Sequence, residues 1–488
     1  MVIFGAMALL ACGGSRTSTP PPAGPPAAAR DFTATRWIPA RPTYAVAARS
    51  VRDAQRATVD VIDSFGMIAG VEVGEVSRAL RGMLAVDPLA PEAITAMGID
   101  VDGGIAMFSE SMNPTFVVHL SAPDQTQAFF DRERERGLAT QSQIVDGAEI
   151  FTAKLDSKLG VSWVVVKDWL WIHFTLPIGV DEGTTWFTSS RTAGAPTWSA
   201  DWEWAEQGGK PTLVGFVDPR GLLSKLSVRI PEAVACARLF EPVGRVGFSI
   251  EGDGRRVGGR LAIDVGSSAN GIAKAVLPAP NGWGAAAGTA PLAVQWNLDL
   301  LALRTWLTPC ARTFDRDLSA IDTYGVRTAR VLLQSFDPDD KSGSGAVALD
   351  LTSGKYFASL LDQIPLRSTF ESRRTYGPHA GRSLSVPFGP KIDYVLTDTL
   401  ALAGVGDGLL ARVVGGDATR TPGAPGPLLA IDVMPGGLSR ETWEFLLRTA
   451  EIPQSKRIAE RLMRWRDGHL AIKVDGTRLV LEASGNRK

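Results

Sequence analysis

Four segments of the chain share one pattern of apolar and polar positions. Each has a proline, then a short extended apolar run, then a stretch with helical periodicity, and they start at Arg41, Lys210, Ala290 and Gly426. A proline is tolerated at the first residue of a strand, and a change of apolar period from two to about 3.6 residues marks the step from strand to helix. The pattern therefore predicts four segments that each begin with a strand followed by a helix.

The stretches that follow these four openings also repeat. After the first and third openings, the apolar spacing predicts a hairpin, a helix and three strands, which gives long units with the order β-α-β-β-α-β-β-β. The second and fourth openings begin shorter units that close on hairpins with the turns Asp253-Gly254 and Asp475-Gly476, and Asp-Gly is a strong hairpin signal. We therefore expect an internal duplication, with a first half at residues 37–285 and a second half at residues 288–488.

The predicted elements place the body of the chain in the α+β class. Hairpins give mostly antiparallel sheets, and the helices between them are expected on one face of those sheets. A length of 488 residues fits two or more domains. The segment between the halves is rich in Gly, Pro and Ala, as a linker is.

The first 36 residues have a different character. Residues 2–11 are uncharged and mostly apolar, which is too short for a bilayer span but typical of the apolar part of a signal peptide. Residues 13–36 are rich in Pro, Gly, Ser and Ala and have no apolar period, so we expect them to stay extended over roughly 70 Å. We therefore predict a signal peptide at residues 1–11 and a tether at residues 12–36.

The sequence Leu9-Leu10-Ala11-Cys12 resembles the lipobox of bacterial lipoproteins. The resemblance implies that Cys12 carries the lipid and becomes the first residue of the mature chain. The body would then be anchored to a membrane of the bacterial cell envelope and lie in the periplasm. Gly13 stands where many such proteins retained at the inner membrane have Asp, which favours the outer membrane. The alternative is a cytosolic protein whose first residues are apolar by chance.

The body also resembles a loose group of exported bacterial proteins of unknown function. The resemblance rests on the segments WIPARPTYAVAARS from Trp37 and DYVLTDTLALAGVGDGLLARVV from Asp393. It is a resemblance of pattern and not of chemical residues, and it implies no known activity.

Charge and cysteine content narrow the range of partners and compartments. A net charge of −1 argues against a nucleic-acid partner, because phosphate binding needs a clustered basic surface. Besides Cys12 the chain has two cysteines, Cys236 and Cys310, and an even number in an oxidising compartment predicts one disulfide. Two buried free thiols are the alternative.

No set of residues has the spacing of a catalytic, cofactor or metal site. The four histidines form no i, i+4 or His-x-His pair, which zinc sites use, and the chain has no G-x-S-x-G nucleophile motif. The Gly-rich stretch Asp264–Lys274 lacks the G-K-[ST] ending of a phosphate-binding loop. We therefore expect no catalytic residue, no cofactor and no metal, and a protein that is not an enzyme.

Tryptophan is the one unusual feature of the composition, because seven of the thirteen lie between Trp163 and Trp204. Trp198 and Trp202 have the spacing of one helix face. Together with Trp204 they are candidates for an aromatic surface that binds a glycan, a peptide or a lipid. Packing inside the first half is the alternative.

These features together predict a lipid-anchored cell-envelope protein whose body is a non-catalytic binding or scaffold module in the periplasm. Its partner would be an envelope protein that the sequence does not identify. A carrier or sensor of an apolar ligand, such as a lipid held between sheet and helices, is the alternative, and an enzyme of unrecognised type is a further one. An enclosed apolar cavity would favour the carrier, whereas a broad exposed apolar patch would favour a protein partner.

Overall fold

The structure is a computed structural model of the chain, which divides into two compact units, unit 1 (Met1–Gly266) and unit 2 (Ser267–Lys488). Residues 1–30, which hold the predicted signal peptide and Cys12, lie outside the described residues, and so do residues 265–289, where the sequence places the boundary between the halves. The structure describes residues 31–65, 73–84, 87–155, 159–176, 182–192, 196–206, 210–219, 221, 244–264, 290–313, 318, 324–340, 342–385, 389–406, 408–417, 427–449, 451–452, 454–475 and 478–488.

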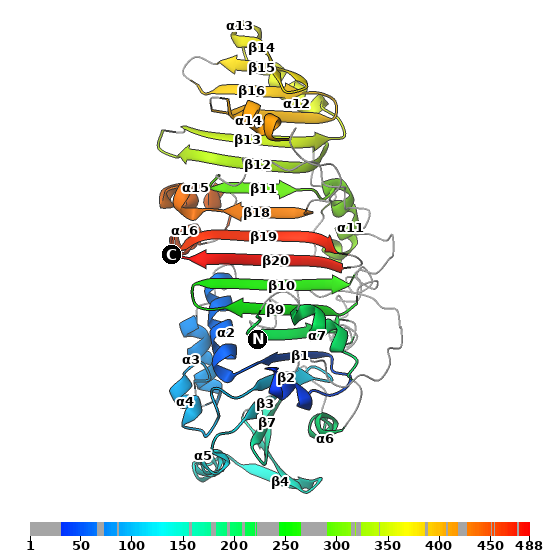
Figure 1. Cartoon of the computed structure of the whole chain (residues 1–488), viewed down its shortest axis with the longest axis vertical. Helices are drawn as coiled ribbons and strands as arrows, with labels where there is room; N and C mark the ends of the chain where they lie inside the picture. Colours follow the sequence, from blue (N-terminus) through cyan, green and yellow to red (C-terminus); the bar gives the residue numbers. More distant parts are fainter. Residues whose placement is uncertain are drawn as a thin grey trace. The chain divides into compact units, whose positions relative to one another are not determined.

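Unit 1 is built on one antiparallel sheet with β1 (Tyr44–Ala48) near its centre (Figure 1). β1 pairs with β2 on one side and with β8 on the other, so that segments far apart in the sequence lie side by side. Each described pairing in this unit is antiparallel. From one edge to the other, the order is β4 (Thr140–Val145), β5 (Ala148–Lys154), β6 (Gly160–Val166), β7 (Trp169–Thr175), β3 (Thr115–His119), β2 (Ile105–Ser109), β1, β8 (Leu213–Val217), β9 (Val246–Gly252) and β10 (Arg256–Asp264).

The sheet of unit 2 has the same strand order, and its pairings are also antiparallel. The central strand β11 (Leu292–Trp296) pairs with β12 and β18, as β1 pairs with β2 and β8. Both units therefore have the mixed α+β class with a large antiparallel sheet that the sequence predicts. The order is β14 (Glu371–Tyr376), β15 (His379–Ser385), β16 (Lys391–Leu396), β17 (Leu400–Val405), β13 (Ser342–Leu351), β12 (Val326–Asp337), β11, β18 (Leu429–Val433), β19 (Trp465–Asp475) and β20 (Arg478–Arg487).

Helices follow corresponding strands in the two units. The first strand of each unit precedes α2 or α11, the third precedes α5 or α12, and the seventh precedes α6 or α14. The helical segments of unit 1 are η2 (Thr33–Trp37), α2 (Val51–Phe65), α3 (Val73–Leu84), α4 (Pro91–Thr95), α5 (Pro123–Glu135), α6 (Thr185–Arg191) and α7 (Ser199–Glu206). Those of unit 2 are α11 (Leu300–Thr313), α12 (Lys355–Asp362), α13 (Arg367–Phe370), α14 (Leu409–Asp417), η5 (Pro435–Gly437), α15 (Arg440–Thr449) and α16 (Ser455–Leu462).

Helices contact both faces of the unit 1 sheet, whereas the sequence predicts helices on one face. Leu170 of β7 belongs to the cluster of buried side chains that includes Phe130 of α5. The next residue, Trp171, points to the opposite face because side chains alternate along a strand, and its ring lies 5.6 Å from that of Phe187 in α6. β7 is apolar at successive positions, and such a strand is stable when both faces of the sheet are covered.

The main core of unit 2 lies between the sheet and α14. Leu402 of β17 and Val395 of β16 pack in one cluster with Leu410 and Val413 of α14. Gly404 of β17 allows this close approach, because a Cβ at that position would stand 3.0 Å from the Cβ of Leu410. A side chain on the strand would therefore push the helix away from the sheet.

The fold begins earlier in the chain than the sequence predicts. Residues 31–36 were expected in the tether, but η2 spans Thr33–Trp37, and Phe32 and Ala34 are completely buried. The physical reason is the two aromatic side chains of this segment. The Phe32 ring packs edge-on against Trp202 at 5.3 Å, and the Trp37 ring packs against the aromatic residues of β7.

Candidate interaction surface

The three tryptophans proposed as a binding surface are core residues. Trp198 is 3% exposed, Trp202 is 0% exposed and Trp204 is 8% exposed. The Trp198 ring stacks on Phe216 of β8, and its Nε1 donates a hydrogen bond of 3.1 Å to the carbonyl of Pro39. The prediction of an exposed aromatic platform is therefore wrong for these side chains, because α7 (Ser199–Glu206) and Trp198 just before it pack against the sheet at β8 and β9.

The cysteine predictions fall outside the described side chains. Cys12 and Cys236 lie outside the described residues, and Cys310 lies in α11 with a side chain that is not described. Lipidation of Cys12 and a disulfide between Cys236 and Cys310 therefore stay predictions.

The described histidines of unit 1 serve packing and pairing. His119 lies between two carboxylates, with Nδ1 at 3.0 Å from Asp100 and Nε2 at 3.2 Å from Asp168. Nδ1 of His173 forms a hydrogen bond of 2.9 Å with the Thr115 hydroxyl. A hydroxyl and an imidazole at this distance are the parts of a nucleophile and base pair. Both are buried, at 1% and 2% exposure, so a substrate has no access to them.

Two further features were sought among the described residues, a cluster of metal-ligating side chains and a membrane-spanning helix. There, no three His, Cys, Asp or Glu side chains gather as a metal site requires. No helix in the described part of the chain is both long enough and apolar enough to cross a membrane.

A cleft of about 370 Å³ opens between α3, α4 and α5 of unit 1. The residues that line it include the apolar Met97 and Phe129 and the charged Arg81 and Arg132. Asp87 also lines the cleft, and a hydrogen bond from the Ser77 hydroxyl, together with Arg81, holds the pKa of the Asp87 carboxyl below its usual range. The cleft is open to solvent, whereas a carrier of an apolar ligand needs a site that encloses most of the ligand.

α12 of unit 2 exposes apolar side chains that its counterpart in unit 1 buries. In α5, Phe130 is 9% exposed and stacks on Trp163 of β6 with ring centroids 4.6 Å apart. In α12, whose residues are all described, no residue is buried. Tyr356 is 37% exposed and Leu360 is 41% exposed. Their spacing of four places them on one face of the helix.

Two further exposed apolar residues lie near α12, one in contact with Tyr356 and one a few residues further along the chain, and both have an unusual backbone. The Tyr324 ring stacks on Tyr356 at 4.2 Å, and Leu366 follows α12 with 69% of its surface exposed. Tyr324 has φ +50° and Leu366 has φ +58°. Large side chains rarely adopt this left-handed region, which costs about 1 kcal/mol per residue. Strained backbone of this kind concentrates at functional sites. We call Tyr324, Tyr356, Leu360 and Leu366 the α12 surface.

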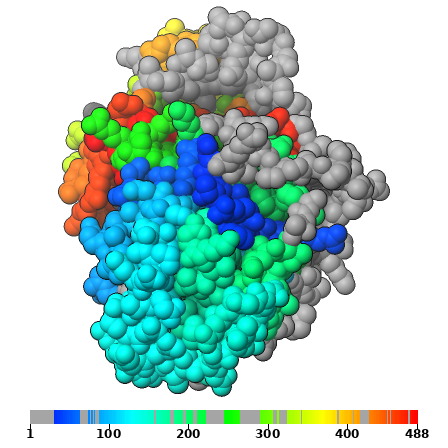
Figure 2. Space-filling view, turned by 60° about the horizontal axis from the view of Figure 1, so that its bottom comes forward, coloured from blue at the N-terminus to red at the C-terminus, as the bar shows by residue number. Residues whose placement is uncertain are grey.

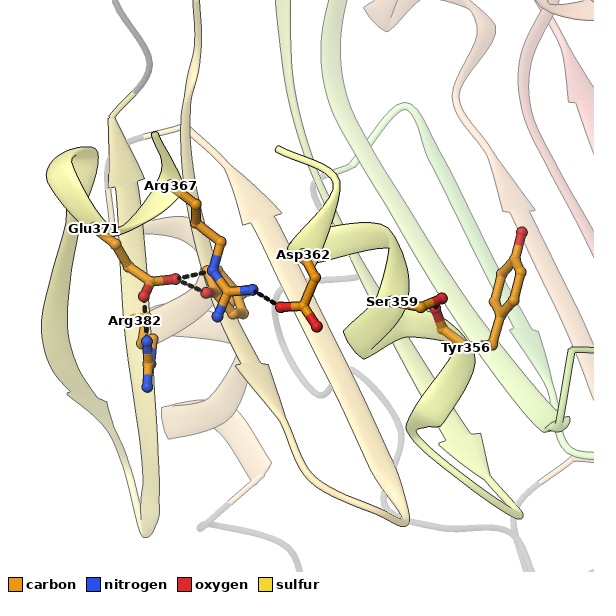
Figure 3. A network of polar contacts seen from close by, with 7 residues as sticks. Tyr356, Ser359, Asp362, Arg367, Glu371 and Arg382 are labelled. Carbon is orange, nitrogen blue, oxygen red and sulfur yellow. Dashed lines mark hydrogen bonds and ion pairs between the residues drawn. The ribbon is translucent and has the colours of Figure 1, made fainter. Parts of the chain in front are cut away.

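A polar network fixes the segment that carries Leu366 (Figure 3). The Glu371 carboxylate accepts hydrogen bonds from Nε of Arg367 at 3.0 Å, from Arg382 and from the hydroxyl of Tyr394. Arg367 also donates to Asp362 at the end of α12, at 2.9 Å. The Glu371 side chain is only 7% exposed. The network therefore ties α12, α13 and three strands together, because a buried carboxylate is stable only with its partners in place.

The sequence predicted α12 as a helix but not its exposure. Tyr356, Phe357, Leu360 and Leu361 lie on one face of the helix, within an arc of about 140°. An apolar face of this width is typical of a helix that packs on the core of its own domain. Periodicity alone cannot tell which of these side chains meets a partner in the same chain.

The comparisons with known proteins identify no family. No protein-family model matches the chain, and no curated protein matches it. The chain is similar to three crystal forms of a protein named TP0453. Form III has a TM-score of 0.28 and 9% identity over 48% of this chain and 80% of that chain. Form I has 0.28 and 9% over 48% and 79%, and form IV has 0.27 and 8% over 47% and 79%. Likeness at this level carries no argument about fold or function.

Proposed function

We propose that the chain is a lipid-anchored protein of the bacterial cell envelope whose body is a non-catalytic module that binds another envelope protein. The lipobox-like sequence ending in Cys12 and the Pro-rich segment after it support the anchor. The anchor would hold the body in the periplasm, at the outer membrane, within reach of partners at the same surface.

The body is an internal duplication in this proposal. Ten described strands of unit 1 and ten of unit 2 follow one spatial order, and helices follow the same strands in both. Duplication leaves two copies that start alike, so one can keep a covered helix while the other acquires an exposed one.

The α12 surface carries the proposal of a protein partner. Four large apolar side chains are exposed there, two of them on strained backbone and one next to a polar network of five residues. An exposed apolar patch bordered by polar groups is typical of a protein-protein interface, and a rigid support lowers the entropy lost on binding.

In-cell photo-crosslinking tests the proposal. A photoreactive residue at position 360 is expected to give a discrete crosslinked product that disappears in Leu366→Glu. A photoreactive residue at position 452 is the matched control, because Ile452 in the same unit is 38% exposed and Leu360 is 41% exposed. Equal crosslinking at both positions would contradict the α12 surface as the binding site.

The anchor is tested separately. Mass spectrometry of the mature protein is expected to find fatty acids on Cys12, and Cys12→Ala is expected to release the protein from the membrane fraction. An unmodified Cys12 in membrane-free extract would contradict the anchor and leave the α12 surface untouched.

A further inference from the structure

The edge strand β4 of unit 1 presents an open hydrogen-bonding edge. Among the described residues it pairs with β5 and with no second strand. The side chains from Gln141 to Ile144 are exposed in succession, and Ile144 is 80% exposed. Figure 2 shows the part of the chain that contains β4, in cyan, on the open surface of the molecule. The backbone N–H and C=O groups on the outer side of such a strand are free to pair with another strand.

β4 lacks the features that protect an edge strand, whereas its counterpart in unit 2 has them. Natural sheets block edges with charged side chains, prolines or covering segments. β4 has the sequence TQSQIV, without a charge or a proline, while β14 has ESRRTY, with Glu371, Arg373 and Arg374. The two strands hold the same position in sheets of the same order, so the difference lies in their sequences.

We infer that β4 pairs with β4 of a second copy of this chain and joins two unit 1 sheets into one. A two-fold axis normal to the sheet requires one residue to face its own copy. Pairing centred on Ser142 or Gln143 satisfies this requirement and brings no like charges face to face. Ser, Thr and Gln side chains both donate and accept hydrogen bonds, so identical strands can satisfy each other.

A second copy fits this edge better than a charged peptide. The strand has no charged side chain that an oppositely charged peptide could pair with. Its exposed Ile144 is partly buried by the facing strand whether the pairing is centred on Ser142 or on Gln143. Six residues bury less than the roughly 800 Å² per partner of a stable interface, so the dimer is weak in dilute solution. Confinement by a lipid anchor, as in the proposed function, would raise the effective concentration at which copies meet. The strand pairing itself does not depend on the anchor or on the α12 surface.

Variants that introduce a positive or a negative charge at one position of β4 test the pairing. Their association is measured on the purified full chain by sedimentation equilibrium. Gln143 faces its own copy if the pairing is centred on Gln143, and lies diagonally across from it if the pairing is centred on Ser142. In both registers, Gln143→Arg and Gln143→Glu each bring like charges close together. We expect the dimer of each variant to be about fivefold weaker than that of the wild type. An equimolar mixture of the two variants is expected to restore association, since opposite charges then face each other. Gln125→Arg, an exposed glutamine on α5, is the matched control and is expected to behave as wild type.

Disulfide trapping gives a second readout. Opposite residues in an antiparallel pair have Cα atoms about 5 Å apart, which suits a disulfide. Ser142→Cys is therefore expected to form covalent dimers on mild oxidation if the pairing is centred on Ser142, and Gln143→Cys if it is centred on Gln143, whereas Gln125→Cys forms none in either register. A wild type that stays monomeric at every concentration, with no covalent dimer from either Ser142→Cys or Gln143→Cys, would overturn the inference. So would a mixture of charge variants that associates no better than either variant alone.

Discussion

Phe130 and Leu360 lie in helices that follow equivalent strands, and the structure predicts opposite consequences when each is replaced by alanine. Phe130 of α5 is 9% exposed and packs in the cluster that holds Trp163 and Leu170. Leu360 of α12 is 41% exposed. If α5 is a core helix and α12 a binding helix, Phe130→Ala should destabilise unit 1 strongly, while Leu360→Ala should leave unit 2 almost unchanged.

The magnitudes follow from burial. Removing a fully buried phenylalanine side chain costs about 3–5 kcal/mol, which includes the cavity left behind. Phe130 also loses its stacked contact with Trp163, at 4.6 Å and 14°, which is part of that total. We therefore expect Phe130→Ala to lower the free energy of unfolding by about 4 kcal/mol. For Leu360→Ala we expect a loss below about 1 kcal/mol, because much of the side chain is already in water.

Urea denaturation separates the two effects. Eight of the thirteen tryptophans lie in unit 1, so fluorescence reports mainly on that unit, and far-ultraviolet circular dichroism follows both. A shift of the fluorescence transition in Phe130→Ala, with an unchanged profile in Leu360→Ala, is the expected result. A loss below 1 kcal/mol for Phe130→Ala, or above about 2 kcal/mol for Leu360→Ala, would refute the contrast between the helices.

Three further predictions concern single contacts. Gly215→Ala should destabilise unit 1 by about 1–3 kcal/mol in thermal unfolding, because its Cβ would stand 2.7 Å from a backbone carbonyl of β1; an unchanged melting temperature would argue against this register. The lowered pKa of Asp87 means that its stabilisation is present above the ordinary value of 3.8 and is lost as the pH falls through the lower value in the folded state. Ser77→Ala should shrink that acid-dependent loss and raise the pKa of Asp87 in an NMR titration, and an unshifted titration would contradict the bond. Arg367→Met should cost about 2 kcal/mol by leaving Glu371 short of a charged partner, and hydrogen exchange that stays slow over residues 362–371 would contradict this role of the network.

The sequence predicted the strands that have a buried face and missed those that do not. Apolar runs such as WLWIHF from Trp169 define β7 directly. β4 and β14 have mostly polar residues, at TQSQIV and ESRRTY, because each lies at the edge of a sheet and few of its side chains are buried. Periodicity reports burial and not hydrogen bonding, so edge strands are the elements it detects least well.

The candidate surface was harder to predict than the fold. Clustered tryptophans drew attention to Trp198 and Trp202, which proved to be buried, since large rings contribute most when they leave water completely. Leu366 stands out through its positive φ and its exposure, and neither property is visible in a residue type. Residue types indicate which side chains could bind a partner, whereas the backbone conformation determines which of them are exposed to solvent.

The buried start of the fold has a mechanical consequence. Phe32 and Ala34 are completely buried, and the Trp37 ring lies 5.0 Å from that of Trp171. A force applied through the residues that precede Asp31 would therefore act on the packed rings of Phe32 and Trp37 in the core of unit 1. If the proposed anchor holds the chain at a membrane, tension along the chain would have to extract these rings before the sheet could yield.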